Sequence, residues 1–318
     1  FMWLQGRQIW TMATMYNEVE AKAEWKEMAL QGAEFILKNG RDENGNWYFA
    51  LDRYGKPLVQ PYNIFSDCFA TMGLAALYKI EKNDQYADVA VSTFNRILER
   101  RDNPKGKYNK QYPNSRSLKG FSLPMILSNL ALELEHIIDK QTVDQLIDEV
   151  MHEVMDVFYQ KDTGLIMESV NLDGSFSDTF EGRLVNPGHI IEAMWFMMDL
   201  AIRREDADLM NRCIDIAIRA LNYGWDQQYG GILYFKDILD KPLLQLEWDQ
   251  KLWWVHLEAL VCMAKGYAYT GRKDCKEWFE KLDEYSFSRF SDPSYGEWYG
   301  YLNRQGEPLL TLKGGKWK

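Results

Sequence analysis

The segment DENGNWYFALDRYGKP, residues 42–57, is the first of five similar turns along the chain. It opens on polar residues and a glycine, continues with alternating apolar and aromatic residues, and ends in a polar turn, which is typical of a small β-hairpin or an extended loop. The other copies, of which the first is the weakest, lie at 103–118, 162–175, 227–242 and 293–308. Intervals of 61, 58, 66 and 66 residues separate their anchoring glycines, which are Gly45, Gly106, Gly164, Gly230 and Gly296.

Segments with helical periodicity fill the intervals between these turns. Each unit of about 60 residues therefore contains two helices and one loop that carries a hairpin. We expect helices at Val19–Lys38, Asp67–Lys82, Gln85–Arg101, Leu123–Ile138, Val143–Tyr159, His189–Arg204, Ala207–Tyr223, Leu252–Thr270 and Lys273–Phe287.

Repeated helix pairs form either an open solenoid or a closed toroid. Hairpin loops at one position of every unit would gather on one face and build a concave site, which favours a closed, all-α (α/α) barrel. The chain shows no linker or compositional break, so we expect one domain over 1–318. It holds about five units, so a ring of six would lack its first and last elements, and we expect a domain truncated at both ends.

Composition excludes several classes of protein. The chain has 318 residues, 46% hydrophobic and 26% charged, which is globular composition. A net charge of -10 argues against nucleic acid as a partner. No apolar run reaches the roughly 18–20 residues that span a bilayer, and the start lacks the layout of a secretory signal. The four cysteines form no C-x-x-C pair, so we expect a cytoplasmic protein.

One of the four histidines stands out by its position. In RLVNPGHIIEAMWFMMDL, His189 follows a Pro-Gly turn and should lie in the first turn of an apolar helix. The helix N-terminus lowers an imidazole pKa there and favours the neutral base. Glu192, three residues on, faces the same side and can orient the ring. The pair suits acid/base chemistry, but it is also common as inert structure.

Two further clusters combine charged and aromatic side chains. In EWDQKLWWVHLEAL, we expect Lys251, Trp254 and Glu258 near one helical face, where burial of Glu258 would require a partner. In QGRQIWTMATMY, Arg7 and Trp10 lie near the start of a helix, and the guanidinium suits recognition of a hydroxyl, carbonyl or anion. An amphipathic helix edge and an inter-helix salt bridge are the respective structural alternatives.

The sequence contains no motif for several other classes of enzyme or metal site. The sequence contains no G-x-S-x-G, G-x-G-x-x-G or P-loop. No H-E-x-x-H or Cys/His cluster offers a metal site, so no metal is expected.

Four segments in order resemble the N-acylglucosamine 2-epimerase family, which includes the renin-binding protein and the cellobiose 2-epimerases. The resemblance covers the full chain and implies an (α/α)6 barrel, in agreement with the repeat. The segments are FMWLQGRQIWTMATMYN (1–17), GRLVNPGHIIEAMW (182–195), KLWWVHLEAL (251–260) and KGGKWK (313–318).

The resemblance also implies roles for individual residues. Arg7 matches the arginine that contacts the sugar oxygens, and His189 matches one of two acid/base histidines. Glu192 and Glu258 match the site carboxylates. The second histidine would lie beyond Lys318, so the chain as given should be inactive or badly impaired. The residues expected to bind the substrate are Trp253, Trp254, Trp317, Trp10, Asp67, Asn186 and Lys251.

The expected activity is reversible 2-epimerisation of N-acetyl-D-glucosamine and N-acetyl-D-mannosamine, an isomerase reaction. One histidine would remove the C2 proton of the open-chain sugar and the other would return a proton to the opposite face. Cellobiose 2-epimerases and related isomerases carry an additional histidine where this chain has Leu127, with no histidine anywhere in 121–135. That departure favours the N-acylglucosamine branch.

Several alternatives remain at this stage. They are a cellobiose 2-epimerase or mannose-type aldose–ketose isomerase, a non-catalytic member that binds a partner, and a glycoside hydrolase on the same barrel, which would need an acidic pair. No cofactor is required, although the family implies ATP as an allosteric activator without any nucleotide motif here. Family members commonly form dimers, but no residue identifies a homodimer interface.

Overall fold

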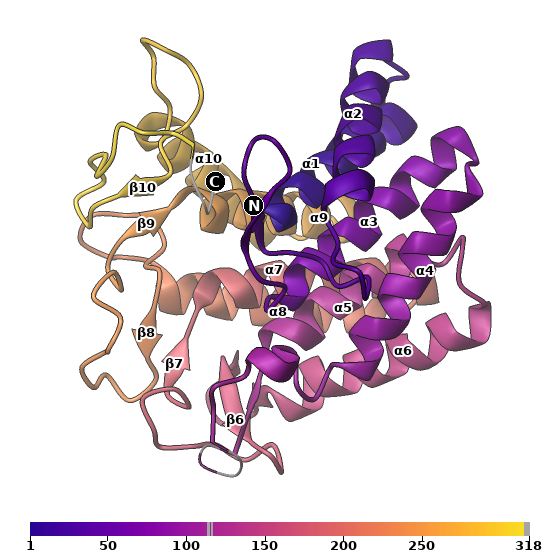
Figure 1. Cartoon of the computed structure of the whole chain (residues 1–318). Helices are drawn as coiled ribbons and strands as arrows, with labels where there is room; N and C mark the ends of the chain where they lie inside the picture. The colour runs from indigo at the N-terminus through magenta and orange to yellow at the C-terminus, as the bar shows by residue number, and fades with distance from the viewer. Residues whose placement is uncertain (113–114, 116, 315–318) are drawn as a thin grey trace. The chain divides into compact units, whose positions relative to one another are not determined.

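The computed structural model describes residues 1–112, 115 and 117–314. The chain forms two compact units, and Figure 1 traces it in both. The first comprises Phe1–Arg116 and Leu130–Gln145, and the second comprises Ser117–Asn129 and Leu146–Lys318. Both consist mainly of helices joined by loops with short strands.

The first unit is built on the packing of α1 (Met2–Thr14) against α3 (Ile64–Glu81). A Cβ at Gly6 would lie 2.5 Å from the backbone carbon of Phe69, so glycine is what allows the two helices to approach so closely. Helices α2 (Ala23–Asn39) and α4 (Asp84–Glu99) pack on α1 and α3, respectively. In the same contact, the guanidinium of Arg7 on α1 lies over the ring of Phe69 on α3.

The second unit is built on α7 (Pro187–Arg204), which packs on both α8 (Ala207–Gly224) and α9 (Trp253–Thr270). Helix α10 (Lys273–Arg289) covers α9. Helices α5 (Ser122–Glu133) and α6 (Lys140–His152) have residues in both units. The apolar sequence of α7 is explained by burial on most of its faces.

The same tight connection joins three helix pairs. Lys82 after α3, Glu205 after α7 and Gly271 after α9 all adopt the left-handed conformation that ends a helix. The side chains of Asn83 and Asp206 then cap α4 and α8 by accepting backbone N–H bonds. Each pair is thus an antiparallel hairpin of helices.

The five turns that recur in the sequence share backbone features in the structure. All five anchoring glycines have a positive φ, between 53° and 77°, which side chains rarely tolerate. In three copies, an aspartate Oδ1 accepts two backbone N–H groups of the turn: Asp42, Asp226 and Asp292. In its described part, the copy at 103–118 forms the 3₁₀ turn Gly106–Tyr108 and the first residue of a strand, Leu118, in line with its weaker pattern.

The strands are two or three residues long and pair only in antiparallel twos. Pairs are formed by β1 with β2, β3 with β6, β4 with β5, β7 with β8, and β9 with β10. Strands β7 and β8 lie at one end of helices α7 and α8 (Figure 1). In chain order, strands β1 to β10 span Ala50–Leu51, Pro57–Val59, Leu118–Gly120, Tyr159–Gln160, Leu165–Ile166, Ser169–Asn171, Leu184–Val185, Lys236–Asp237, Lys251–Leu252 and Tyr301–Leu302.

The nine predicted helices are confirmed within a few residues at their ends. The predicted helix 123–138 ends early, at Glu133. The predicted helix 19–38 starts late, because α1 continues into the π-helical turn Met15–Val19 and α2 starts only at Ala23. The predicted helix 143–159 likewise ends in the π-turn Glu153–Val157.

Candidate active site

His189 lies in the first turn of α7, as the sequence indicates. Strand β7 ends at Val185, and Asn186 then caps the helix by accepting the backbone N–H of His189 at 3.2 Å. Pro187 occupies the first helical position, where its missing N–H has no intrahelical partner to lose. The NPGH sequence therefore holds the imidazole at a fixed helix start.

The hydrogen-bond partner of the imidazole is Glu168. The Nδ1 atom of His189 lies 2.9 Å from Oε1 of Glu168. The backbone of Glu168 is itself fixed, because its N–H donates to Leu184 and its carbonyl accepts from Phe121. Sequence reasoning did not find Glu168, although it directly follows the apolar strand of the turn at 162–175. With 26% of the His189 side chain exposed, a small molecule can reach the ring.

The surroundings of His189 favour its protonated form, contrary to the expectation of a neutral base. Burial disfavours the imidazolium most strongly, but Glu168 and then Glu192 and Glu258 favour it and together outweigh burial. They raise the pKa of His189 to about 9. The expectation considered the helix N-terminus alone, whereas three carboxylates dominate the local field.

The raised pKa of His189 makes stability depend on pH. A group whose pKa is higher in the folded state stabilises the fold below its unfolded pKa, near 6.5, and loses that contribution as pH rises through its folded value of about 9. We expect the free energy of unfolding to fall between these limits by up to about 1.4 kcal/mol per pH unit from this group. Urea denaturation at pH 6, 7, 8 and 9 measures it. A constant difference between the wild type and His189→Asn at every pH would contradict the expectation.

Trp254 forms the wall beside the imidazole. Its ring centroid lies 5.3 Å from that of His189, at an interplanar angle of 33°. The ring of Tyr234 meets the same indole edge-on, with the two ring centroids 6.3 Å apart. Trp254 is in the first turn of α9, so the packing of α7 on α9 brings the two helix starts together. The site thus has an aromatic face adjacent to a charged pair.

Gly188 allows this close approach, and its replacement should disturb the site. A Cβ there would lie 2.7 Å from Val255 and 2.9 Å from the Trp254 ring, closer than real contacts allow. We expect Gly188→Ala to destabilise the fold by about 1–3 kcal/mol, measured by urea denaturation. Gly120→Ala is the matched control, because a Cβ at Gly120 meets nothing within 4 Å. Equal effects of the two changes would show that the α7–α9 contact is not tight.

Glu258 is half-buried and has a hydrogen-bond partner. The indole Nε1 of Trp195, on α7, donates to Glu258 Oε2 at 2.7 Å. Glu192 and Glu258 both act electrostatically on His189. The structure therefore brings together four predicted residues, His189, Glu192, Trp254 and Glu258.

Two of the predicted residues of the first unit, Arg7 and Asp67, have partners that the sequence did not indicate. The guanidinium of Arg7 lies over the ring of Phe69, 4.0 Å from its centroid, and 5.0 Å from that of Trp3. This is cation–π packing, which sequence reasoning did not anticipate. Asp67, at the start of α3, is buried and pairs with Arg100 at 3.0 Å. Burial raises the pKa of Asp67 to about 6 despite that partner.

Lys251 has a structural position, contrary to the expected helical face with Trp254 and Glu258. It lies on β9, before the helix begins, and its side chain is fully buried. Its Nζ donates to Asp226 Oδ2 and to the carbonyls of Gly230 and Arg304 at 2.7–3.1 Å. All three ammonium protons are therefore used to join two loops, and none is directed to a ligand.

The remaining predicted residues have no described contact with His189, apart from the capping bond of Asn186 noted above. Trp253 begins α9, and its backbone N–H donates to Gly300. Trp10 lies on α1 with its indole nitrogen buried and without a hydrogen-bond partner. Trp317 falls outside the described residues.

The other three histidines are engaged elsewhere. His256 is fully buried, with Nε2 accepting from Ile232 and Nδ1 bonded to the Leu252 carbonyl, and burial lowers its pKa to about 4. His136 bonds the Ala75 carbonyl, and the exposed His152 lies 3.3 Å from Asp156.

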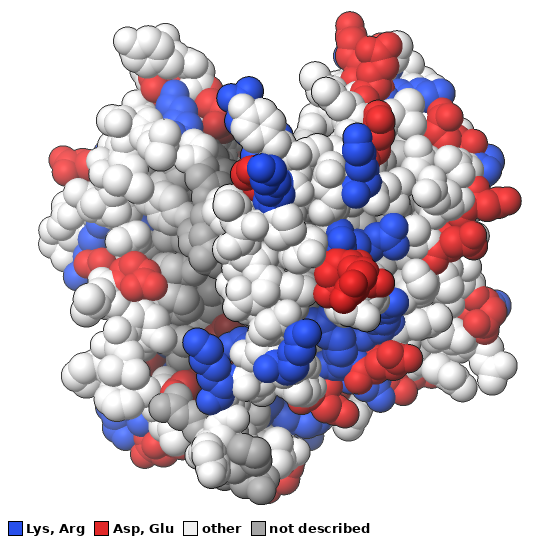
Figure 2. All heavy atoms as spheres, in the orientation of Figure 1, with Lys and Arg blue, Asp and Glu red and all other residues white. Residues whose placement is uncertain are grey.

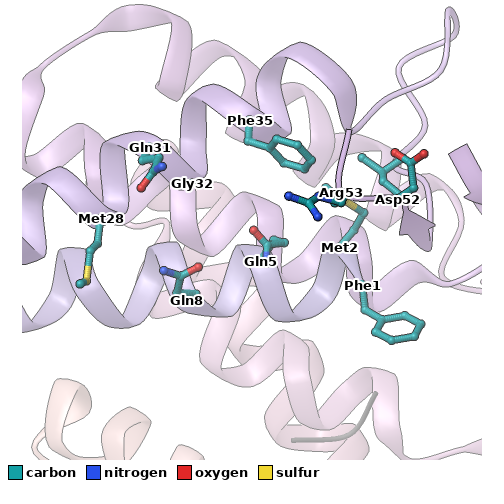
Figure 3. A pocket seen from close by; sticks show the side chains of 11 residues that line it. Phe1, Met2, Gln5, Gln8, Met28, Gln31, Gly32, Phe35, Asp52 and Arg53 are labelled. Carbon is teal, nitrogen blue, oxygen red and sulfur yellow. The ribbon is translucent and has the colours of Figure 1, made fainter. Parts of the chain in front are cut away.

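A pocket of about 450 Å³ lies between α1, α2 and the loop after β1. Figure 3 shows Gln5 and Gln8 of α1 extending toward α2, with Arg53 beside Asp52 at one end. None of the predicted site residues lines it.

Searches for other kinds of site gave negative results within the described part of the chain. No group of three or more His, Cys, Asp or Glu side chains there could hold a metal ion. Among residues 1–112, 115 and 117–314, no helix has the length and hydropathy to cross a membrane. Acidic and basic side chains are interspersed on the face in Figure 2.

Comparisons with known proteins agree on one family. A family model described as N-acylglucosamine 2-epimerase (GlcNAc 2-epimerase) matches residues 1–318. The N-acylglucosamine 2-epimerase of Rattus norvegicus is 35% identical over 328 residues, covering 100% of this chain and 78% of the relative. The cellobiose 2-epimerase of Dictyoglomus turgidum is 23% identical over 333 residues, covering 99% and 82%.

A solved structure has the same fold. The cellobiose 2-epimerase from Bacillus thermoamylovorans B4167 superposes with a TM-score of 0.84 at 18% identity, covering 100% of this chain and 84% of that one. The all-α fold of helix pairs is therefore confirmed, and its class is the (α/α)6 barrel of these enzymes.

Proposed function

The chain belongs to the N-acylglucosamine 2-epimerase family, and we propose that it interconverts N-acetyl-D-glucosamine and N-acetyl-D-mannosamine by proton transfer at C2. The observation that carries the proposal is the His189–Glu168 pair, held at the start of α7 beside Trp254. It supplies a fixed, partly exposed proton donor next to an aromatic surface.

His189 in its resting state is the acid of the reaction. In the open-chain sugar, the C1 carbonyl acidifies the C2 proton, and its removal by a base on the opposite face gives an enediolate-type intermediate. The imidazolium of His189 then donates its proton to C2 from its own face, which inverts the carbon. In the reverse direction the neutral ring removes that proton. Each such transfer contributes roughly a hundred- to ten-thousand-fold to the rate.

The carboxylates support this cycle. Glu168 stays bonded to Nδ1, so it fixes the ring orientation and stabilises the imidazolium each time it forms. Glu192 and Glu258 stabilise the same charge and bind sugar hydroxyls. Trp254 stacks on the apolar face of the sugar. The family resemblance implies for Arg7, whose guanidinium lies over the Phe69 ring, the stabilisation of the negative charge that develops on the sugar oxygen.

Two observations support an N-acyl sugar over a disaccharide. Identity to the rat N-acylglucosamine 2-epimerase is 35%, against 23% to the Dictyoglomus cellobiose 2-epimerase. In α5, position 127 carries a buried leucine in place of the histidine of the disaccharide branch.

Substrate preference is tested by comparing kcat/KM for N-acetylmannosamine, mannose and cellobiose, using the natural gene product that contains these 318 residues. We expect the N-acylated sugar to be preferred by at least about tenfold, which corresponds to about 1.4 kcal/mol. A preference for cellobiose or mannose would overturn the substrate assignment and leave the family assignment intact.

Four further features belong to the proposal. One catalytic domain over 1–318 and a cytoplasmic location are inferred from the sequence, whereas assembly as a homodimer and ATP as an allosteric activator are implied by the family resemblance. Assays with and without ATP, and the mass of the protein in solution by light scattering, test the last two directly.

A further inference from the structure

A row of charged and aromatic side chains extends from His189 along the contact between α7 and α9. On α7, Trp195 and Asp199 follow His189 and Glu192 at intervals of three or four residues, so all four lie near one face of the helix. Glu258 and Lys265 face them from α9. Trp195, Asp199 and Lys265 have no part in the proposed chemistry.

The contacts in this row are specific. Trp195 Nε1 donates to Glu258 Oε2 at 2.7 Å. The Lys265 ammonium lies 4.7 Å from the centroid of the same indole and forms an ion pair with Asp199. About a fifth of the Lys265 side chain is exposed, at 19%, so solvent screens this charge only partly.

The arrangement strengthens the bond to Glu258. A cation over an indole face draws electron density from the ring, which makes the Nε1–H a better donor. The acceptor is a carboxylate, and hydrogen bonds to ionised groups are shorter and stronger than neutral ones. The 2.7 Å distance is at the short end for an N–H donor.

We propose that Trp195, backed by Lys265, is a positioning residue that orients the Glu258 carboxylate beside His189. The inference rests on the proposed function, because it concerns the same sugar site. Packing alone does not require an indole here, since Trp195 also meets Phe196 edge-to-face at 4.2 Å and a phenyl ring would keep that contact. The indole N–H is the group that a phenylalanine lacks.

A double-mutant cycle tests the proposal. Trp195→Phe should lower kcat for N-acetylmannosamine epimerisation by about tenfold to a hundredfold, the value of a hydrogen bond to a charged group. In a Glu258→Gln background the same change should cost less than about twofold, because Trp195 acts through that carboxylate. Equal losses in the two backgrounds, or no loss in the single variant, would overturn the proposal. Trp278→Phe, on α10, is the matched control and should retain wild-type activity.

An independent readout keeps the test valid if Trp195→Phe fails to fold. In ¹⁵N-edited NMR spectra, the Trp195 indole proton should resonate downfield of the other indoles and move upfield in both Glu258→Gln and Lys265→Met. No movement in either variant would overturn the proposal. This readout needs no turnover, so it is separate from the proposed function, which fails if the wild type epimerises no sugar.

Discussion

Replacement of His189 by asparagine is expected to lower the rate of C2 proton exchange by about a hundred- to ten-thousand-fold. Asparagine keeps a polar side chain at the start of α7 but cannot donate and accept a proton near neutral pH. Because Asn186 caps the helix through the backbone N–H of residue 189, the substitution should leave that cap in place. Exchange is measured by NMR on the natural gene product, with circular dichroism as the check on folding.

His152→Asn is the control for this experiment. His152 is exposed and interacts with Asp156 on its own helical segment, outside the site. The His152→Asn variant should catalyse exchange of the C2 proton at the wild-type rate. If His189→Asn retained activity within about threefold of the wild type, the assignment of His189 as the proton donor would be wrong, since loss of a general acid lowers the rate by at least about a hundredfold.

Replacement of Glu168 by glutamine should lower the pKa of His189 from about 9 toward its ordinary value. The amide can still bond to Nδ1, but it cannot compensate the charge of the imidazolium, and burial then favours the neutral ring. We expect kcat to fall by about tenfold to a hundredfold, by analogy with the loss of a carboxylate that supports a metal-bound histidine. NMR titration of the imidazole measures the pKa, and a pH–rate profile measures the kinetic effect.

Glu153→Gln is the matched control for that substitution. Glu153 pairs with Lys119 at 2.8 Å in the same unit and has no described contact with His189. It should leave the titration of His189 unchanged. A Glu168→Gln protein in which the histidine still titrated near 9 would mean that Glu192 and Glu258 dominate, and that Glu168 does not set the protonation state.

The helices and turns could be predicted from the sequence because their signals are local. Apolar periodicity marks each helix, and the repeated glycines mark positions where the backbone requires a positive φ. The helix starts at Asn186 and Asp206 follow from capping chemistry that lies within three residues.

Residues of the site could be predicted together only where they lie close to one another in the sequence. His189 and Glu192 share one helix, whereas Glu168 reaches the imidazole from a hairpin 21 residues earlier in the chain, and no periodicity connects them. The Trp195–Glu258 bond spans 63 residues and two helices. The predicted helical face is wrong at Lys251 for a local reason. Helix α9 begins only at Trp253, and Lys251 lies two residues earlier on β9, which pairs with β10.

The protonation state of His189 could not be read from the sequence for a related reason. A helix N-terminus is visible in one segment and disfavours the cation. The opposing field comes from Glu168, Glu192 and Glu258, which lie on three different elements. Only the packed structure shows which effect is larger.

The central claim is that C2 is inverted by exchange of its proton with a protonated His189. The most direct measurement is incubation of the natural gene product with N-acetylmannosamine in deuterium oxide, followed by NMR of C2 in the product. We expect N-acetylglucosamine that carries deuterium at C2, because the imidazolium proton exchanges with solvent before transfer. N-acetylglucosamine that retains the original hydrogen at C2 would contradict the account, as would complete absence of both exchange and inversion.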